Sequence, residues 1–235
     1  MWTDAKNSHW RLRVSNLKEL AHRYRRFPFI SSWSAFLNTA GLQLPTLLIV
    51  ALYGVEPAGL FALVQRVIGN PLDTVGQSVS QLYAGKVPQL LRNNPTELRR
   101  LFTRTVIQLA IVGSIPTLVV LVFGDQLFEF AFGEQWADGG TYARILMSFL
   151  YIRFVTSPLS QTLNILERQE LQLIWDVIRL LISSGGVVFS AQMGLSYETA
   201  LGIYSTSMVV AYLILLSLIY YALRPARLMH SHTRT

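Results

Sequence analysis

The chain has 235 residues, of which 51% are hydrophobic and only 14% are charged, and its formal net charge is +7. A soluble domain has roughly a quarter of its residues charged, so the composition indicates a membrane protein. The absence of cysteine excludes a disulfide framework and a thiolate metal site. The positive charge does not indicate nucleic-acid binding, because the basic residues flank apolar stretches, where anionic inner-leaflet lipids attract them.

The first segment, residues 1–28, is a basic arm that precedes the apolar stretches. Leu17, Leu20 and Tyr24 can share one face of a helix, while basic side chains on the other face point toward lipid headgroups. This pattern predicts a cytoplasmic interfacial helix rather than a signal peptide. We expect Pro28 to end that helix before the first membrane span.

Six apolar stretches follow, each near the roughly 20 residues that a helix needs to cross the hydrocarbon of a bilayer. They lie at 29–53, 57–82, 101–123, 139–164, 170–191 and 198–223, and a basic tail follows at 224–235. Between the spans, Lys and Arg occur only on alternate connections, and the third connection, 124–138, carries only acidic charges. The positive-inside rule then places both termini in the cytoplasm. In the second connection, Thr96 and Glu97 indicate a helix start.

Six charged residues lie inside these spans beyond their first and last turns, and a charge at the bilayer centre costs about 2.5–3.5 kcal/mol if it faces lipid. They are therefore expected to face protein or a water-filled cavity. Arg144 is close enough to the outer end of its span to reach the interface. The six residues are Arg66, Asp73, Arg144, Arg153, Asp176 and Arg179.

Polar residues follow helical spacing on three of the spans. The stripes are Arg66, Asn70, Asp73, Gln77 and Gln81 on the second; Arg153, Ser157, Ser160 or Gln161, and Asn164 on the fourth; and Gln172, Asp176, Arg179, Ser183 and Gly186 on the fifth. Three striped helices in one bundle favour a hydrated lumen. The alternative is that Arg66 pairs with Asp73, and Arg179 with Asp176, as buried structural pairs.

The arginines indicate what such a lumen would bind. Counted along the spans, Arg66, Arg153 and Arg179 lie well inside the membrane, and the guanidinium fork matches phosphate oxygens without losing its charge. The predicted cargo is anionic. All four histidines lie outside the spans, and we expect neither a metal ion nor a cofactor.

Proline and glycine interrupt the spans at Pro45, at the run Gly69-Asn70-Pro71, at Pro116 and at Pro158. Such breaks kink helices and are tolerated beside cavities in membrane proteins. They could allow alternate opening of the two sides, although ordinary packing kinks would give the same pattern.

Short motifs in a fixed order give the chain a resemblance over roughly residues 20–225. It resembles the second half of bacterial polysaccharide-biosynthesis flippases, in the superfamily of multidrug, oligosaccharidyl-lipid and polysaccharide exporters. The motifs are Phe27-Pro28, the Leu-Gln-Leu-Pro run at 42–45, Tyr53 to Glu56 with Gly59-Leu60, Arg66 to Leu72 with Gly76-Gln77, Phe132-Gly133-Glu134 with Trp136 and Ala137, and Ser157 to Ser160 leading to Glu167-Arg168-Gln169.

The resemblance implies an all-α protein of the bacterial inner membrane, whose six transmembrane helices form one lobe of a two-lobe exporter. It implies a transporter rather than an enzyme, with an isoprenoid-pyrophosphate-linked sugar as cargo, moved from the inner to the outer leaflet for surface polysaccharides such as O-antigen. The partner would be the missing N-terminal lobe or a second membrane subunit. Arginines would attract the pyrophosphate, Asp73 and Asp176 would hold them, and Asn70, Gln77, Gln81 and Asn164 would meet sugar hydroxyls.

Three other functions stay open at this stage. A cation-coupled drug exporter of the same superfamily would need an acidic, aromatic pocket. A membrane enzyme such as a sugar polymerase would need a long outer loop with a base, and 124–138 has none. A non-transporting assembly subunit would need no cargo site.

Overall fold

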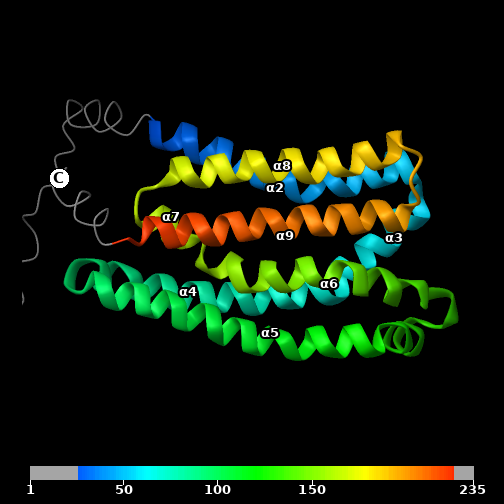
Figure 1. Cartoon of the computed structure of the whole chain (residues 1–235), viewed down its shortest axis with the longest axis horizontal. Helices are drawn as coiled ribbons and strands as arrows, with labels where there is room; N and C mark the ends of the chain where they lie inside the picture. Colours follow the sequence, from blue (N-terminus) through cyan, green and yellow to red (C-terminus); the bar gives the residue numbers. More distant parts are fainter. Residues whose placement is uncertain (1–25, 225–235) are drawn as a thin grey trace, which may run out of the picture.

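The computed structural model of the chain describes residues 26–224, and every regular element in that range is a helix. Figure 1 shows the long helices running side by side in one bundle. Residues 1–25 of the predicted interfacial arm 1–28, and the basic tail beyond residue 224, lie outside the described residues. The first described helix begins at Arg26 and contains Pro28 in its first turn, where a proline is tolerated.

Helices occupy all six stretches that the sequence marks as apolar. Their bounds are α2 Arg26–Tyr53, α3 Val55–Val64, the π-helical η1 Gln65–Gly69, α4 Asn70–Asn93, α5 Pro95–Phe132, η2 Glu134–Trp136, α6 Asp138–Thr156, the 3-10 helix η3 Ser157–Leu159, α7 Gln161–Ile165, α8 Gln169–Gln192 and α9 Tyr197–Ala222.

Three of these helices, α5, α8 and α9, are both long enough and apolar enough to cross a membrane. An all-α membrane protein is thereby confirmed. The second and fourth stretches are divided into shorter helices, at η1 and at η3, and charged residues lower their hydropathy. In the first stretch, residues Thr39–Tyr53 of α2 form an apolar helical segment. Six membrane crossings therefore remain a prediction.

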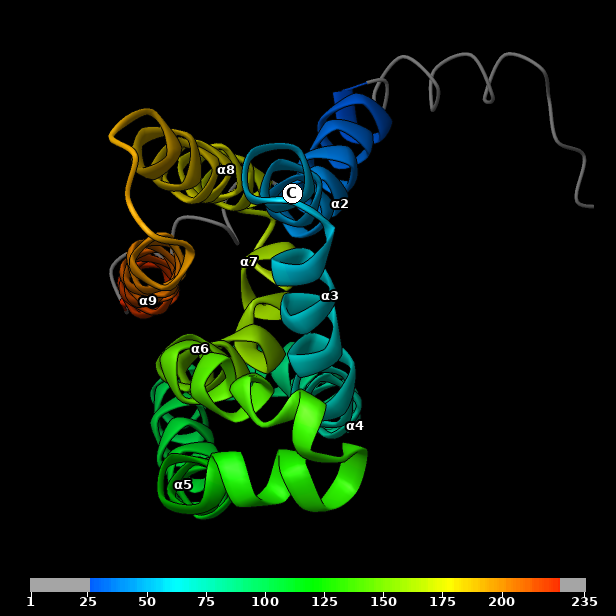
Figure 2. The same cartoon turned by 90° about the vertical axis from the view of Figure 1, so that its right-hand side faces the viewer.

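The bundle has two groups of helices when viewed along its axis. Figure 2 shows α2, α8 and α9 on one side, α4, α5 and α6 on the other, and α3 and α7 between them. The two groups are joined where α9 packs along α6. Within the first group, α8 packs along both α2 and α9. The second stretch crosses from one group to the other, since α3 follows α2 and α4 packs against α5 and α7.

Aromatic rings fill the space between the two groups. Phe149 of α6 is fully buried, and its ring centroid lies 5.8 Å from that of Tyr204 and 6.1 Å from that of Tyr212, both on α9. Phe61 of α3 meets Tyr204 from the other side at 5.7 Å. In a bilayer such contacts are stabilised by close packing rather than by transfer out of water, so the shape of these rings fixes how α3, α6 and α9 meet.

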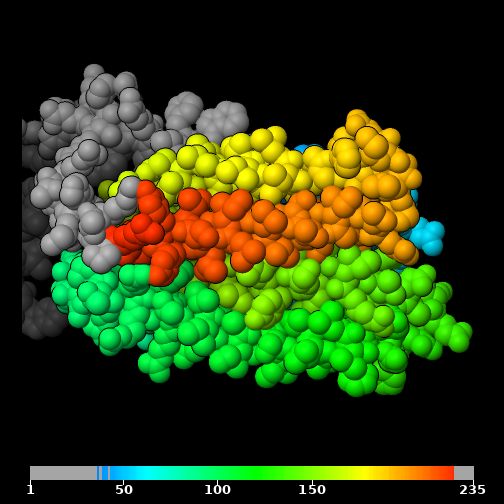
Figure 3. All heavy atoms as spheres, in the orientation of Figure 1, coloured from blue at the N-terminus to red at the C-terminus, as the bar shows by residue number. Residues whose placement is uncertain are grey.

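The outward faces of the bundle are apolar. Large hydrophobic side chains of α5 are widely exposed, among them Ile111 at 63%, Ile115 at 65% and Leu118 at 60%. The space-filling view shows α8, α9 and α5 together covering one face of the molecule (Figure 3). Such a surface fits contact with lipid chains.

Candidate functional site

The polar stripe of the second stretch keeps to one side of a helix in the structure. Arg66 lies in η1, and Asn70, Gln77 and Gln81 follow on α4; all four residues are exposed, while Asp73 is partly buried. Among the described residues, Arg66 takes part in no ion pair. A guanidinium group without a carboxylate partner therefore stands on the surface of a mostly apolar protein.

Arg66 belongs to an irregular turn. The backbone N–H of Asn70 donates to the carbonyl of Gln65, five residues back, which makes η1 π-helical. Pro71 follows and supplies no backbone N–H. The side chain of Gln65 folds over Gly69, where a Cβ would lie 2.6 Å from Oε1 of Gln65. Turns of this kind are rare and occur often at functional sites.

Asp73 joins the stripe to α6. Its carboxylate accepts a hydrogen bond from Nη2 of Arg153, and the two side chains are 29% and 13% exposed. The Arg153 guanidinium also lies 5.8 Å from the centre of the Phe149 ring. The alternative that pairs Asp73 with Arg66 is thus wrong: the carboxylate of Asp73 is paired with Arg153 of α6 and not with Arg66, which lies about two helical turns earlier.

Asp176 and Arg179 form a second pair, which is enclosed. Nη2 of Arg179 lies 3.5 Å from Oδ1 of Asp176, and the side chains are only 2% and 0% exposed. The Arg179 guanidinium stacks 4.5 Å above the ring of Trp175, whose Nε1 donates to the carbonyl of Ala211 on α9. On the other side it packs against Gly41 of α2, where a Cβ would lie 2.9 Å from Nη2.

Asn164 is exposed on the short helix α7 and donates to Oε1 of Gln161 at 3.3 Å. α7 and η3 pack against α4: Thr162 donates to the Tyr83 hydroxyl at 3.0 Å, and Gly76 faces Pro158. The structure therefore places Asn164 on an element that neighbours the stripe of α4.

The predicted site residues thus divide into two sets. Arg66, Asn70, Gln77 and Gln81 are exposed on η1 and α4, with Asp73, Arg153 and Asn164 on or beside them, whereas Asp176 and Arg179 are enclosed by α2, α8 and α9. The two sets do not share one surface. Their role in binding remains a prediction, and the surface set is the one that a ligand could reach without movement of helices.

Sequence reasoning missed the partner of Arg144. Its Nη2 donates to the carboxylate of Asp125 near the end of α5, and Thr141 donates to the same carboxylate at 3.3 Å. Asp125 is the first acidic residue after the third span, so its position at the same membrane end as Arg144 was the available signal. The pair ties α5 to α6 at their connection.

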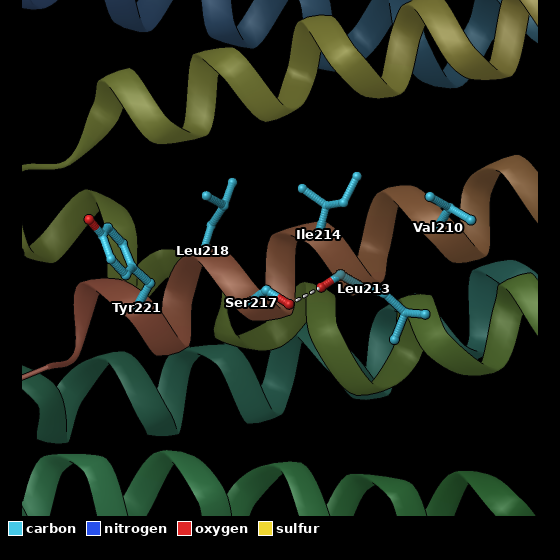
Figure 4. Close-up of a pocket in the computed structure, with 6 residues that line it drawn as sticks. All are labelled: Val210, Leu213, Ile214, Ser217, Leu218 and Tyr221. Carbon is cyan, nitrogen blue, oxygen red and sulfur yellow. Dashed lines mark hydrogen bonds between the residues drawn. The ribbon is translucent and has the colours of Figure 1, made fainter.

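A shallow groove lies on the outward side of α9 (Figure 4). Its lining is apolar apart from Tyr221 and from Ser217, whose hydroxyl donates to the carbonyl of Leu213 at 2.9 Å. It contains none of the predicted site residues, so it offers hydrocarbon contact rather than recognition of a charged group. Over residues 26–224, no cluster of three or more metal-binding side chains occurs.

A family model described as polysaccharide biosynthesis protein matches residues 3–139, more than half of the chain. The chain belongs to this family. No curated protein and no solved structure matches it. Within the described residues, the matched part runs from α2 to the first residues of α6 and contains the whole stripe of η1 and α4. Arg153, Asn164, Asp176 and Arg179 lie beyond it.

Proposed function

We propose that the chain is the C-terminal lobe of a flippase in the bacterial inner membrane. Its cargo is an isoprenoid-pyrophosphate-linked sugar unit, moved from the inner to the outer leaflet for surface polysaccharide synthesis. Membership of a polysaccharide biosynthesis family supports the pathway. The observation that carries the transport role is the exposed stripe headed by Arg66, on a helix inside a predicted membrane region.

The stripe suits a headgroup that is anionic at one end and rich in hydroxyls at the other. Arg66 keeps its charge at any physiological pH and can donate two parallel hydrogen bonds to phosphate oxygens. Asn70, Gln77 and Gln81 follow along the same side and offer both donors and acceptors to sugar hydroxyls. Asp73 holds Arg153 beside them, so that a second guanidinium is positioned next to the stripe.

The same stripe argues that this bundle works with a partner. Arg66 is exposed on the isolated bundle, and a charge facing lipid at mid-membrane costs about 2.5–3.5 kcal/mol. A second lobe that covers this side would replace lipid with a water-filled space between two bundles. A second lobe, on the same polypeptide or on a separate membrane subunit, is therefore part of the proposal.

A cation-coupled drug exporter is the second candidate of the superfamily. It would need a carboxylate free to bind a cation or a proton. In this bundle both intramembrane aspartates, Asp73 and Asp176, are paired with arginines. Of the six charged residues inside the spans, Arg66 is the one that takes part in no ion pair with a described residue. That balance favours an anionic cargo.

Transport can be tested in lipid vesicles that contain the whole chain, with and without a candidate second lobe, such as a membrane protein encoded by a neighbouring reading frame. A fluorescent isoprenoid-pyrophosphate sugar is incorporated, and an impermeant reductant destroys the label in the outer leaflet. We expect label from the inner leaflet to become reducible when both proteins are present, and Arg66→Gln to prevent this. Arg104→Gln is the matched control, because Arg104 is an exposed arginine that lies on α5 and not on η1 or α4. If no label moves between the leaflets, with or without the second membrane protein, the result would favour a non-transporting subunit.

A further inference from the structure

The C-terminal end of α5 has an arrangement that the proposed transport does not explain. With 38 residues, α5 is about 57 Å long at 1.5 Å per residue, nearly twice the roughly 30 Å of hydrocarbon. Its apolar stretch 101–123 accounts for about 34 Å, so the residues after Phe123 begin at the membrane border. Figure 2 shows the bright-green end of α5 running across the end of the bundle rather than along it.

This crosswise segment is fixed to the bundle by backbone contact and by an ion pair. A Cβ on Gly140 would lie 2.4 Å from backbone atoms of Asp125, and one on Gly124 would lie 3.1 Å from the carbonyl oxygen of Gly140. Asp125 is held by Arg144 and by Thr141. The direction of the segment is therefore set by packing at its first residues.

The segment has one side packed and another side apolar and uncovered. Phe128 is 3% exposed because its ring lies on Gly139, where a Cβ would be 2.6 Å from its Cδ1. Phe130 is 93% exposed, with Leu127 at 41% beside it. Gln126 and Glu129 are exposed polar residues of the same turns. A phenylalanine this exposed, on a short amphipathic helix at the level of the membrane border, is the arrangement of an interfacial anchor.

We infer that residues 126–132 lie in the lipid interface at the end of the bundle that holds the α5–α6 connection, with Phe130 and Leu127 inserted between acyl chains. The lipid-contacting surface of α5 continues directly into the segment through Phe123, which is 53% exposed. The connection 124–138 contains acidic residues and no Lys or Arg, so the headgroups it suits are zwitterionic rather than anionic. The segment would hold the α5–α6 end at a fixed depth in that leaflet.

The chain has no cysteine, so single cysteines can report on this segment without background. Phe130→Cys and its matched control Glu129→Cys are each placed in vesicles of zwitterionic phospholipid, with a polar maleimide present on both sides. A thiol held away from water stays protonated and reacts slowly. We expect Cys at 130 to react at least about tenfold more slowly than Cys at 129 in vesicles, and equally fast after denaturation in sodium dodecyl sulfate.

A second measurement identifies what covers Phe130. A fluorophore on each cysteine is exposed to phospholipids brominated near the top of their acyl chains, which quench only on contact. We expect stronger quenching at 130 than at 129, unchanged when the protein is diluted in lipid. Equal maleimide rates in vesicles would overturn the inference, because Phe130 would then face water. Protection that disappears on dilution would also overturn it, because a second copy of the chain would be the occupant.

Discussion

At the scale of single residues, the enclosed pair Asp176–Arg179 is where stability and function can be separated. Neither charge is accessible, and the guanidinium is held between Trp175 and Gly41. Removing one member of a buried ion pair takes compensation away from the remaining charge and is strongly destabilising, whereas replacing both members can be nearly neutral. The pair is therefore explained as a contact that holds α2 to α8, and Arg179 can reach cargo only if these helices separate.

We predict that Asp176→Asn alone and Arg179→Gln alone each lower the free energy of unfolding by about 3–5 kcal/mol, and that the double change restores most of it. Thermal unfolding of purified protein in detergent measures the effect. The double variant should fold yet transport poorly if Arg179 also serves the cargo. A double variant that is less stable than either single one would contradict the buried-pair account.

At the scale of elements, the sequence predicted helix positions well and helix interruptions poorly. The predicted start at Thr96 and Glu97 is confirmed: the side chain of Asn94 caps α5 by accepting from the N–H of Glu97. Pro45 and Pro116, in contrast, lie inside unbroken helices. The run Gly69-Asn70-Pro71 and Pro158 coincide with η1 and η3. A proline removes one donor and crowds the carbonyl four residues earlier. Packing with neighbouring helices then decides whether the helix changes its turn.

The candidate site shows the same limit to prediction from sequence: contacts that depend on how helices pack were not found. Helical spacing predicted that the polar residues of η1 and α4 share one side of the helix, and that Asp176 and Arg179 lie close enough on one helix to pair. It could not find that Arg153, eighty residues away, is the partner of Asp73, because that contact depends on how α4 and α6 pack. Nor could it find the glycine contact between α5 and α6, since a glycine in a sequence does not show which backbone approaches it.

That glycine contact gives a prediction at the element scale. Gly140→Ala should lower the free energy of unfolding by about 1–3 kcal/mol, because the new methyl group would overlap the backbone of α5 at Asp125. Gly185→Ala on α8 is the matched control: no atom lies near its Cβ position, so the change should be neutral or stabilise by about 0.5–1 kcal/mol through helix propensity. Detergent unfolding of both variants decides, and equal stability of the two would show that the close approach is absent in solution.

At the scale of the whole molecule, α5, α8 and α9 are long and apolar enough to cross a membrane, and the alternation of basic connections predicts six crossings in all. Single cysteines at Lys86 and Gln126 test the arrangement in cells, since both positions are exposed. A membrane-impermeant maleimide added outside should label Gln126→Cys and leave Lys86→Cys unlabelled until the cells are opened. Labelling of both from outside, or of Lys86→Cys alone, would rule out the predicted six-span topology.

The central claim is that the surface stripe binds an anionic isoprenoid headgroup, and direct binding tests it most closely. Purified whole chain in detergent is titrated with farnesyl pyrophosphate, with farnesol as the uncharged probe. A hydrogen bond to a charged group contributes about 1.5–3 kcal/mol, so Arg66→Gln should weaken pyrophosphate binding roughly 10- to 150-fold and leave farnesol binding unchanged. Arg66→Lys should recover only part of the affinity, and Arg104→Gln should not alter it. Equal affinity of wild-type protein and Arg66→Gln for farnesyl pyrophosphate would contradict the account.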